Sequence, residues 1–420
     1  MMIRPKIKEQ PNEDRRSVIK SVARKAAAVA LAASLSIGAG AAFGSSNSIP
    51  IAADAYATQT CSGQVAAATQ ISLDHTVDPV IANADNKAMS ALQKMYNPST
   101  GLFNGAQWWQ QPVILQTIMD YSQLSHNYKY MGDVCRTFVL NRGGNFLNAF
   151  NDDEGWWAQA WLQAYGMTKN PQYLGMAKSL FNNMSESWNG ECGGGILWYK
   201  YGPYKNAIAN ELFMSVALSL YSATGDKAYL DWSFKEYDWF MRTGLLGRSN
   251  QVKDGLGRGC VAGGGIWTYN QGELIGALTR LTRITGNKLY IGKAEAIATS
   301  NDAESTGKSG TLHEIGCAHT SHCNISTDNL GSGNSKRTTG FSVDNAQFKG
   351  IYIMNLYYMY QTDHNAAYLD FILKNARAIE SKDNNGRNII GLNWSDPSRY
   401  WSVTEASTQA SGIAALNAGQ

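Results

Sequence analysis

Two adjacent acidic residues, Asp152 and Asp153, stand in the stretch NDDEGWWAQAW that begins at Asn151. Carboxylates on consecutive residues can be held close together, because neighbouring Cα atoms are about 3.8 Å apart. Retaining glycosidases use such a close pair, with one carboxylate as nucleophile and the other as acid and base. Asp and Asn also cap helices, and acidic side chains favour a helix N-terminus. The stretch therefore fits either a catalytic pair or a simple helix start.

Aromatic and amide residues gather in other segments of the chain. These segments read AQWWQQP, ECGGGILWYK, YKNAIANELF and VAGGGIWTYNQGE. Trp and Tyr rings can pack on the apolar faces of sugars, and amides can both donate to and accept from hydroxyl groups. The segments favour a sugar-binding cleft, although packing in a helical core explains any single Trp equally well.

Other motifs were weighed as cofactor sites. The repeated GGGI lacks the GxxxxGK[ST] pattern of a phosphate loop, so nucleotide binding is not expected. The stretch HEIGCAHTSHC offers Cys and His ligands for zinc, but six Cys in an exported chain favour disulfides. We expect no metal and no other cofactor. Cys192 and Cys260 both lie in Gly-rich segments and are expected to pair, while Cys317 and Cys323 could close a local loop.

A recurring turn pattern predicts helical hairpins. A polar cluster, a Tyr and an apolar helix-forming run recur, with the Tyr at positions 130, 173, 229, 290 and 368. The periodicity predicts helices near 76–96, 107–125, 128–140, 153–166, 171–185, 204–223, 227–243, 270–285, 288–300, 343–361, 366–380 and 402–416.

Connection lengths alternate along this series of helices. Short turns alternate with long Gly- and Asn-rich loops, so all the long loops fall at the same end of the antiparallel hairpins. The chain is therefore predicted to be an all-α (α/α)6 barrel of six helical hairpins with long loops on one face. Asp152 and Asp153 belong to that face. An open helical solenoid would keep a nearly fixed period, whereas the Tyr spacings are 43, 56, 61 and 78 residues.

The N-terminal segment predicts export. Arg15 to Lys25 is rich in basic residues and precedes an Ala-rich apolar run, which is typical of a signal peptide. We expect a targeting segment over 1–57 and a single catalytic domain over 58–420; an uncleaved anchor is the alternative. After residue 57, acidic and basic residues almost balance, so the sequence shows no excess of positive charge that would bind nucleic acid or an anionic membrane. We expect a secreted monomer without stable membrane insertion.

Together these segments resemble glycoside hydrolase family 76, the endo-α-1,6-mannanases, from about residue 76 onward. The motifs that carry the resemblance are GLFNGAQWW, NDDEGWWAQAW, CGGGILWYK, YKNAIANELF, GGGIWTYNQGELIGAL, LHEIGC and QFKGIYIMNLYYMY. The resemblance implies an (α/α)6 barrel and a mannan or manno-oligosaccharide substrate. It also implies that Asp152 is the nucleophile and Asp153 the general acid and base.

On this basis, substrate contacts are expected from aromatic, amide and acidic residues of the loop-rich face. They are Trp109, Asn151, Trp157, Asn206, Tyr269, Asn270, Gln271 and Asp344. Two alternatives stay open at this point. The chain could be a transglycosidase of cell-wall mannan, or a non-catalytic sugar-binding or interaction protein on a helical scaffold.

Overall fold

Helices dominate the structure, a computed structural model that describes residue 61 and residues 77–306, 310–314, 343–382, 386–395 and 405–420. In these ranges twelve α-helices lie within the unit Pro50–Gln420. They are α3 Pro79–Gln93, α4 Gln110–Ser125, α5 Met131–Asn141, α6 Asn151–Thr168, α7 Pro171–Ser185, α8 Ala207–Thr224, α9 Lys227–Thr243, α10 Thr268–Thr285, α11 Lys288–Ser305, α12 Phe348–Asp363, α13 Ala366–Lys382 and α14 Ala406–Gly419. Each predicted helix is present, with its ends shifted by up to five residues.

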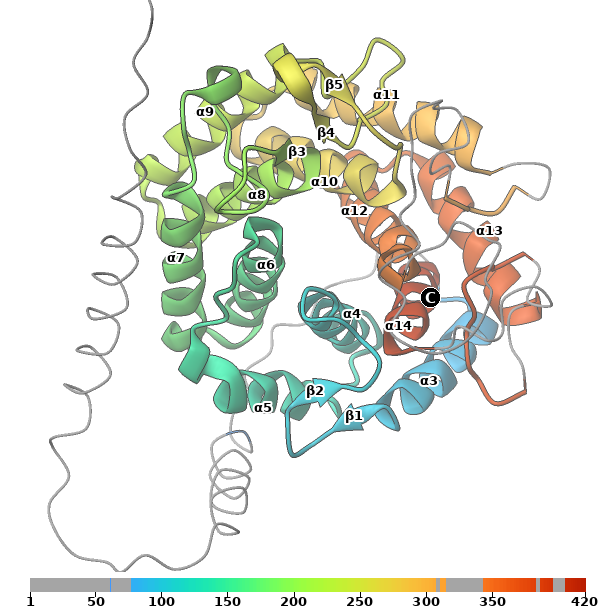
Figure 1. The fold of residues 1–420 in the computed structure, drawn as a ribbon. Coiled ribbons are helices and arrows are strands. Elements are labelled where there is room, and N and C mark those ends of the chain that lie inside the picture. Colours follow the sequence, from blue (N-terminus) through green and yellow to red (C-terminus); the bar gives the residue numbers. More distant parts are fainter. Residues whose placement is uncertain (1–60, 62–76, 307–309, 315–342, 383–385, 396–404) are drawn as a thin grey trace, which may run out of the picture. The chain divides into compact units, whose positions relative to one another are not determined.

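The helices form two concentric rings (Figure 1). Helices α4, α6, α8, α10, α12 and α14 form the inner ring, in which each packs on the next and α14 packs on α4. Helices α3, α5, α7, α9, α11 and α13 surround them. Because α14 contacts both α4 and α3, the ring is closed rather than an open solenoid. The predicted (α/α)6 barrel is confirmed.

The short turns between inner and outer helices share one local design. After α6, Lys169 takes a left-handed conformation with φ of 56°, and the next residue, Asn170, caps α7 with its side chain. The turns after α8 and α10 repeat this design with Gly225 and Asp226, and with Gly286 and Asn287. The polar turn clusters seen in the sequence therefore end one helix and start the next.

Glycine allows the inner helices to approach closely. A Cβ on Gly272 of α10 would lie 2.6 Å from the Cα of Tyr352 in α12. A Cβ on Gly350 of α12 would lie 2.7 Å from the Cα of Ser411 in α14. Such distances leave no room for any side chain. The α10–α12 and α12–α14 contacts thus need glycine at these two positions.

Long loops and short strands cover one end of the barrel. Strands β1 Tyr96–Asn97 and β2 Leu102–Phe103 pair antiparallel, and β3 Lys205–Asn206, β4 Gly255–Leu256 and β5 Ala262–Gly263 form a second antiparallel sheet in the order β3-β4-β5. Short 3-10 helices lie at Arg142–Gly144, Glu191–Gly193, Arg258–Cys260 and Val343–Ala346.

Two disulfides are present among the described residues. The predicted Cys192–Cys260 bridge is confirmed, and it joins two long loops of this end of the barrel. Cys61 pairs with Cys135 of α5. Cys317 and Cys323 lie outside the described residues.

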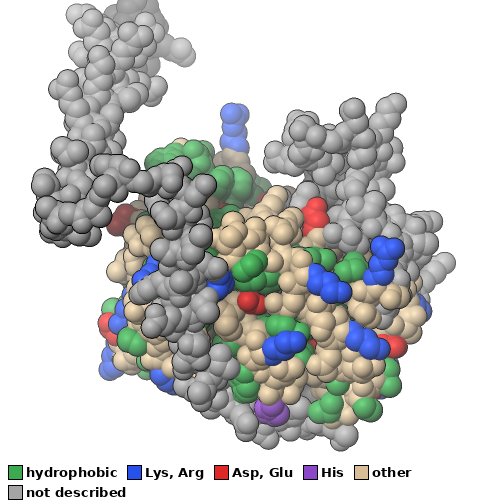
Figure 2. Space-filling model, turned by 90° about the horizontal axis from the view of Figure 1, so that it is seen from below, with side chains coloured by type: hydrophobic (Ala, Val, Ile, Leu, Met, Phe, Trp, Pro, Cys, Tyr) green, Lys and Arg blue, Asp and Glu red, His purple; other side chains and the backbone are tan. Residues whose placement is uncertain are grey.

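The surface of the described residues carries mixed charge. On the face in Figure 2, Lys and Arg side chains are scattered among acidic, apolar and uncharged polar groups. None of the described helices combines the length and the apolar character needed to cross a bilayer.

Candidate active site

The two candidate catalytic residues lie in the first turn of α6. This helix begins at Asn151, two residues before the predicted start at 153, so both Asp152 and Asp153 lie inside it. The residue at the N-cap is Phe150, and no side chain caps the helix there. The capping role weighed from the sequence is therefore not the one these carboxylates play. Their position at the positive end of the helix still favours negative charge.

Asp152 is held by two N–H donors. The indole Nε1 of Trp198 donates to its Oδ2 at 2.7 Å, and the backbone N of Asp153 donates to its Oδ1 at 3.1 Å. Asp153 Oδ2 accepts a 2.5 Å hydrogen bond from the side chain of Asn148. Burial, together with the charge of Asp153, raises the pKa of Asp152, while the hydrogen bonds oppose that shift. Two carboxylates held this close disfavour the state in which both are ionised.

The loop 195–204 positions the start of α6. Asn151 donates its backbone N–H to the carbonyl of Trp198 at 2.9 Å and its side-chain amide to Leu197 O at 2.7 Å. Lys200 donates its backbone N–H to Ala149 O at 3.0 Å, and its ammonium forms an ion pair with the buried Glu154. Because Trp198 belongs to the same loop, these bonds fix its indole over Asp152.

The Gly-rich run before this loop has a packing role. A Cβ on Gly195, at φ of 80°, would lie 2.4 Å from the Trp239 ring, so only glycine fits there. The ammonium of the buried Lys205 donates to Glu191 O at 2.7 Å and to Gly195 O at 2.9 Å. Burial lowers the pKa of Lys205 to about 8. The first GGGI thus allows tight folding over a tryptophan.

Aromatic rings from three inner helices meet beside the loop-rich face. Tyr269 of α10 stacks on Phe348 of α12, with ring centroids 3.8 Å apart. Trp109, just before α4, lies 6.0 Å from Phe348 and 6.1 Å from Trp156, and Trp267 lies 5.9 Å from Phe348. The structure thus brings together two sequence-predicted contacts, Trp109 and Tyr269. Phe348, at their centre, belongs to the motif QFKGIYIMNLYYMY but was not among the predicted site residues.

Several other predicted contacts make structural bonds. Gln271 accepts from Val252 N at 2.8 Å and donates to Val252 O at 2.9 Å, so it holds the loop before β4. Asn206 caps α8 by accepting from Ala209 N at 3.2 Å. Trp157 has no exposed surface and packs on Trp108 and Phe146. Gln271 and Trp157 are completely buried and packed or bonded within the protein, so they leave no surface for a sugar.

The remaining predicted residues differ in surroundings. Asn151 and Asn270 are fully buried, and both side-chain polar atoms of Asn270 lack a hydrogen-bond partner among the described residues. Asp344 lies in the 3-10 helix Val343–Ala346, and its side chain is outside the described part of the structure.

No cluster of three His, Cys, Asp or Glu suited to a metal occurs among the described residues. Trp198, the donor to Asp152, was missed as a site residue, although the ILWYK motif contains it.

The glycosyl hydrolase family 76 model matches residues 80–419, which is most of the chain. The chain belongs to glycosyl hydrolase family 76. Among the curated relatives, a mannan endo-1,6-alpha-mannosidase, DCW1, of Candida glabrata is 28% identical over an alignment of 255 residues, with coverage of 54% of this chain and 57% of that protein. The DCW1 protein of Saccharomyces cerevisiae is 27% identical over an alignment of 255 residues, with coverage of 54% of this chain and 56% of that protein. The chain thus spans little more than half the length of these relatives.

Solved structures of family 76 extend the similarity to the fold. The GH76A α-1,6-mannanase of Salegentibacter sp. HEL1_6 superposes with a TM-score of 0.69 at 26% identity, covering 81% of this chain and 98% of that one. An inactive variant of that enzyme, with two consecutive aspartates replaced by alanine, has been solved with α-1,6-mannotetrose. It superposes with a TM-score of 0.67 at 25% identity, covering 81% of this chain and 98% of that one.

Proposed function

We propose that this chain is a secreted endo-acting mannanase that cleaves α-1,6-mannosidic bonds of a mannan backbone with retention of configuration. The observation that carries the proposal is the Asp152–Asp153 pair at the loop-rich end of a family 76 barrel, with Trp198 hydrogen-bonded to Asp152. The family 76 α-1,6-mannanase described as inactive lacks two consecutive aspartates, which supports assigning the reaction to this pair. The basic and Ala-rich segment within residues 1–57 supports export.

Asp152 is proposed as the nucleophile and Asp153 as the general acid and base. The Asp152 carboxylate attacks the anomeric carbon, the glycosidic C–O bond breaks, and Asp153 gives its proton to the leaving oxygen. Asp153 then takes a proton from water as the water oxygen displaces Asp152 from the ester. The raised pKa of Asp152 alone would equally suit an acid. Its two N–H donors favour the nucleophile role, because they stabilise and orient an anion.

The sugar chain is proposed to lie along the aromatic rings of the loop-rich face. Trp109 and Tyr269 are partly exposed and flank Phe348, so they can stack on sugar faces. Tyr201 is 81% exposed and its ring lies 5.5 Å from that of Tyr199, in the loop that fixes Trp198. An exposed aromatic pair beside the reactive carboxylates suits an enzyme that holds several sugar units. Asp344 remains a proposed contact.

The direct test is incubation with linear α-1,6-mannan followed by sizing of the products. We expect early release of oligosaccharides of several lengths from the wild-type protein and none from Asp152→Asn. Release of mannose alone from the first time points would contradict endo action. Binding of mannan with no turnover would favour the alternative of a sugar-binding protein.

The stereochemical course tests the double displacement. Adjacent aspartates hold their carboxyls close, and retaining enzymes need about 5–5.5 Å between them, against about 6.5–9.5 Å for inverting ones. We therefore expect proton NMR to show the α-anomer first, before mutarotation. First appearance of the β-anomer would contradict the mechanism. Added manno-oligosaccharide should also capture the mannosyl ester, and transfer exceeding hydrolysis would favour the transglycosidase alternative.

A further inference from the structure

A cavity opens at the end of the barrel opposite the Asp152–Asp153 pair. Its volume is about 560 Å³, within the roughly 300–1,000 Å³ usual for small-ligand sites. Its lining comes mainly from the second halves of the inner helices, including Gln163 of α6, and also takes in Gln159 near the middle of that helix. At a rise of about 1.5 Å per residue, Gln159 lies about 10 Å along α6 from Asp152. Neither Asp152 nor Asp153 lines the cavity, although its lining reaches Trp156, one helical turn after Asp152.

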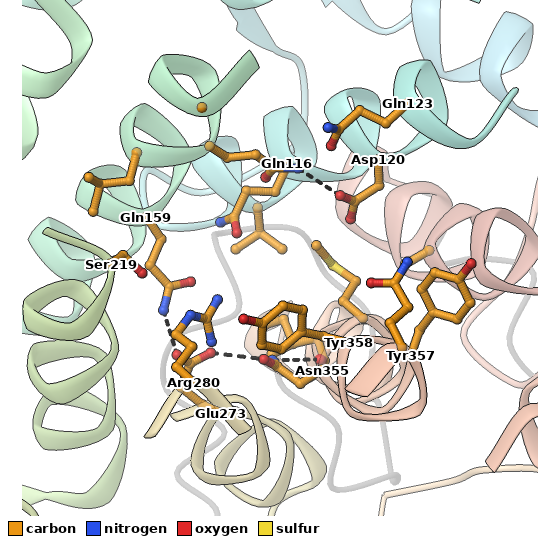
Figure 3. Close-up of a pocket in the computed structure, with 18 of the residues that line it drawn as sticks. Gln116, Asp120, Gln123, Gln159, Ser219, Glu273, Arg280, Asn355, Tyr357 and Tyr358 are labelled. Atoms are coloured by element: carbon orange, nitrogen blue, oxygen red, sulfur yellow. Dashed lines mark hydrogen bonds between the residues drawn. The ribbon is translucent and has the colours of Figure 1, made fainter. Parts of the chain in front are cut away.

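Polar side chains converge on this cavity from several helices (Figure 3). Gln159 Nε2 donates to Glu273 Oε1 at 2.5 Å, and Asn355 Nδ2 lies 3.4 Å from Glu273 Oε2. On the other side, Gln163 Nε2 donates to Asp120 Oδ1 at 2.7 Å. These pairs hold the carboxylates in fixed positions along the cavity wall.

Three lining residues keep hydrogen-bonding atoms unsatisfied. Gln116 of α4 is more than nine-tenths buried, and its Nε2 donor has no partner among the residues that the structure describes. Within the same described ranges, Arg280 Nη1 is a second buried donor without a partner, and the Oδ1 of the buried Asn417 is an acceptor without one. Buried donors and acceptors are normally satisfied, by protein, water or a ligand. The cavity thus offers both kinds of group to an occupant.

The charges around the cavity select the kind of occupant. Glu273 disfavours an anion, and Asp120 does so in its ionised form, with burial raising the pKa of Asp120 to about 7. Lys169, Arg280 and Arg283 disfavour a cation, and both arginines lie over the Tyr358 ring, at 4.9 and 4.1 Å from its centroid. A neutral polyol meets neither repulsion, and each of its hydroxyls can both donate and accept.

We propose that this cavity is a second binding site, for a neutral mono- or disaccharide, held by Gln116, Arg280 and Asn417. The site goes beyond the proposed hydrolysis and does not depend on it. Trp156 lines the cavity, and its ring centroid lies 6.1 Å from that of Trp109 in the aromatic group near the active site. A sugar in the cavity would therefore contact a residue that also packs against the proposed substrate wall.

The test uses crystals of the full chain soaked separately in mannose, glucose, α-1,6-mannobiose, acetate and phosphate. The Asp152→Asn variant is used, so that mannobiose is not consumed. We expect at least one of the three sugars to occupy the cavity within hydrogen-bond distance of Gln116 Nε2 and Arg280 Nη1. A cavity that holds water alone in all three sugar soaks, or that takes acetate or phosphate instead, would overturn the proposal.

Calorimetric titration of the bound sugar provides the matched comparison. Gln116→Leu removes the free donor with little change in volume and should weaken binding at the second site at least ten-fold. Gln172→Leu, on the exposed face of α7, should leave it unchanged. If Gln116→Leu unfolds at the normal temperature and binds the sugar as tightly as before, the proposal is overturned. If Gln116→Leu does not fold, Arg280→Met is titrated instead, and unchanged binding in that variant overturns the proposal. Gln116→Leu should still cleave mannan, so failure of the proposed hydrolysis is measured independently.

Discussion

Trp198 orients Asp152, and this contact helps to assign the roles of the two aspartates. Trp198 offers one N–H donor, and the backbone N–H of Asp153 offers the other, so the Asp152 carboxylate has a fixed direction. Asp153 is held separately by Asn148. The two neighbouring carboxylates therefore have different hydrogen-bond partners, which is what two different chemical roles require.

Replacing either aspartate should remove the chemistry and leave the fold. Asp152→Asn and Asp153→Asn are each expected to lower kcat/KM on α-1,6-mannan by about a thousand-fold or more, because nucleophile and acid act as one unit. Loss of a helix-capping group would cost about 0.5–2 kcal/mol of stability and spare the reaction. Activity assays combined with thermal unfolding distinguish a catalytic role of the aspartates from a helix-capping role. Near-normal turnover with a lowered Tm in both variants would show that the pair is structural.

The Trp198 hydrogen bond predicts a pH effect. Its N–H stabilises the Asp152 anion and so lowers a pKa that burial raises. Trp198→Phe keeps an aromatic ring but removes the donor, so the pKa of Asp152 should rise and the acid limb of the kcat/KM profile should move to higher pH. A charged-group hydrogen bond of about 1.5 kcal/mol corresponds to about one pH unit.

The matched control for this variant is Trp188→Phe. The Trp188 ring packs on Trp232, 5.5 Å away, and belongs to the preceding loop. The pH profile of kcat/KM in Trp188→Phe should match that of the wild type. An acid limb that stays in place in Trp198→Phe, or moves to lower pH, would contradict the assignment.

At the scale of elements, buried amides attach the long loops to the inner helices. Gln111 of α4 accepts from Phe103 N at 2.8 Å and donates to Phe103 O at 2.9 Å. Asn210 of α8 makes the same pair of bonds to Ile196, at 2.8 and 3.1 Å, and Gln271 of α10 makes it to Val252. Each amide lies in the first turn of an inner helix. The amide-rich motifs therefore hold the loops that form the candidate site.

One of these contacts can be tested with a nearly isosteric change. Gln271→Leu leaves the N–H and C=O of the buried Val252 without partners, at a cost of about 1–3 kcal/mol for each group. We expect the free energy of unfolding, measured by denaturant titration, to fall by several kcal/mol. Gln172→Leu, at an exposed position of α7, should change it by less than about 0.5 kcal/mol. An equal loss of unfolding free energy in Gln271→Leu and Gln172→Leu would show that the buried hydrogen bonds to Val252 add no stability.

The whole molecule depends on closing a ring of six inner helices. Helix α14 lies between α12 and α4 and also packs on α3, so the last helix of the chain meets the first hairpin. All fourteen of its residues are buried. Ring closure (Figure 1) gives the barrel two ends, and the candidate active site lies at the N-terminal ends of the inner helices, whereas most of the cavity lining comes from their second halves.

Two Gly→Ala changes should have opposite effects on the barrel. Gly350→Ala places a Cβ 2.7 Å from Ser411 Cα and must push α12 away from α14, so unfolding should become easier by about 1–3 kcal/mol. Gly292→Ala, in the outer helix α11, meets no atom within 4 Å and should stabilise by about 0.5–1 kcal/mol. Thermal unfolding of both variants gives the comparison. A stabilised Gly350→Ala protein would show that the α12–α14 contact does not limit stability.

The sequence by itself predicted the hairpins, the barrel and the end of the barrel on which Asp152 and Asp153 lie. Helix periodicity and turn chemistry act over a few residues, and the alternation of short and long connections then determines which ends meet. The Cys192–Cys260 bridge followed from the same placement. Sequence patterns were sufficient for those features that depend on residues close together in the chain.

Only the tertiary structure decided what the individual side chains contact. Gln271 was predicted to bind sugar, yet it holds Val252, because folding places that backbone beside it and a buried peptide group needs a partner. Phe348 became the centre of the aromatic group because α12 lies beside α10 and near Trp109, 239 residues earlier in the chain. The unsatisfied donors of Gln116 and Arg280 share one cavity for the same reason. Contacts between side chains of distant segments depend on how the helices pack inside the closed ring, and no local pattern encodes that packing.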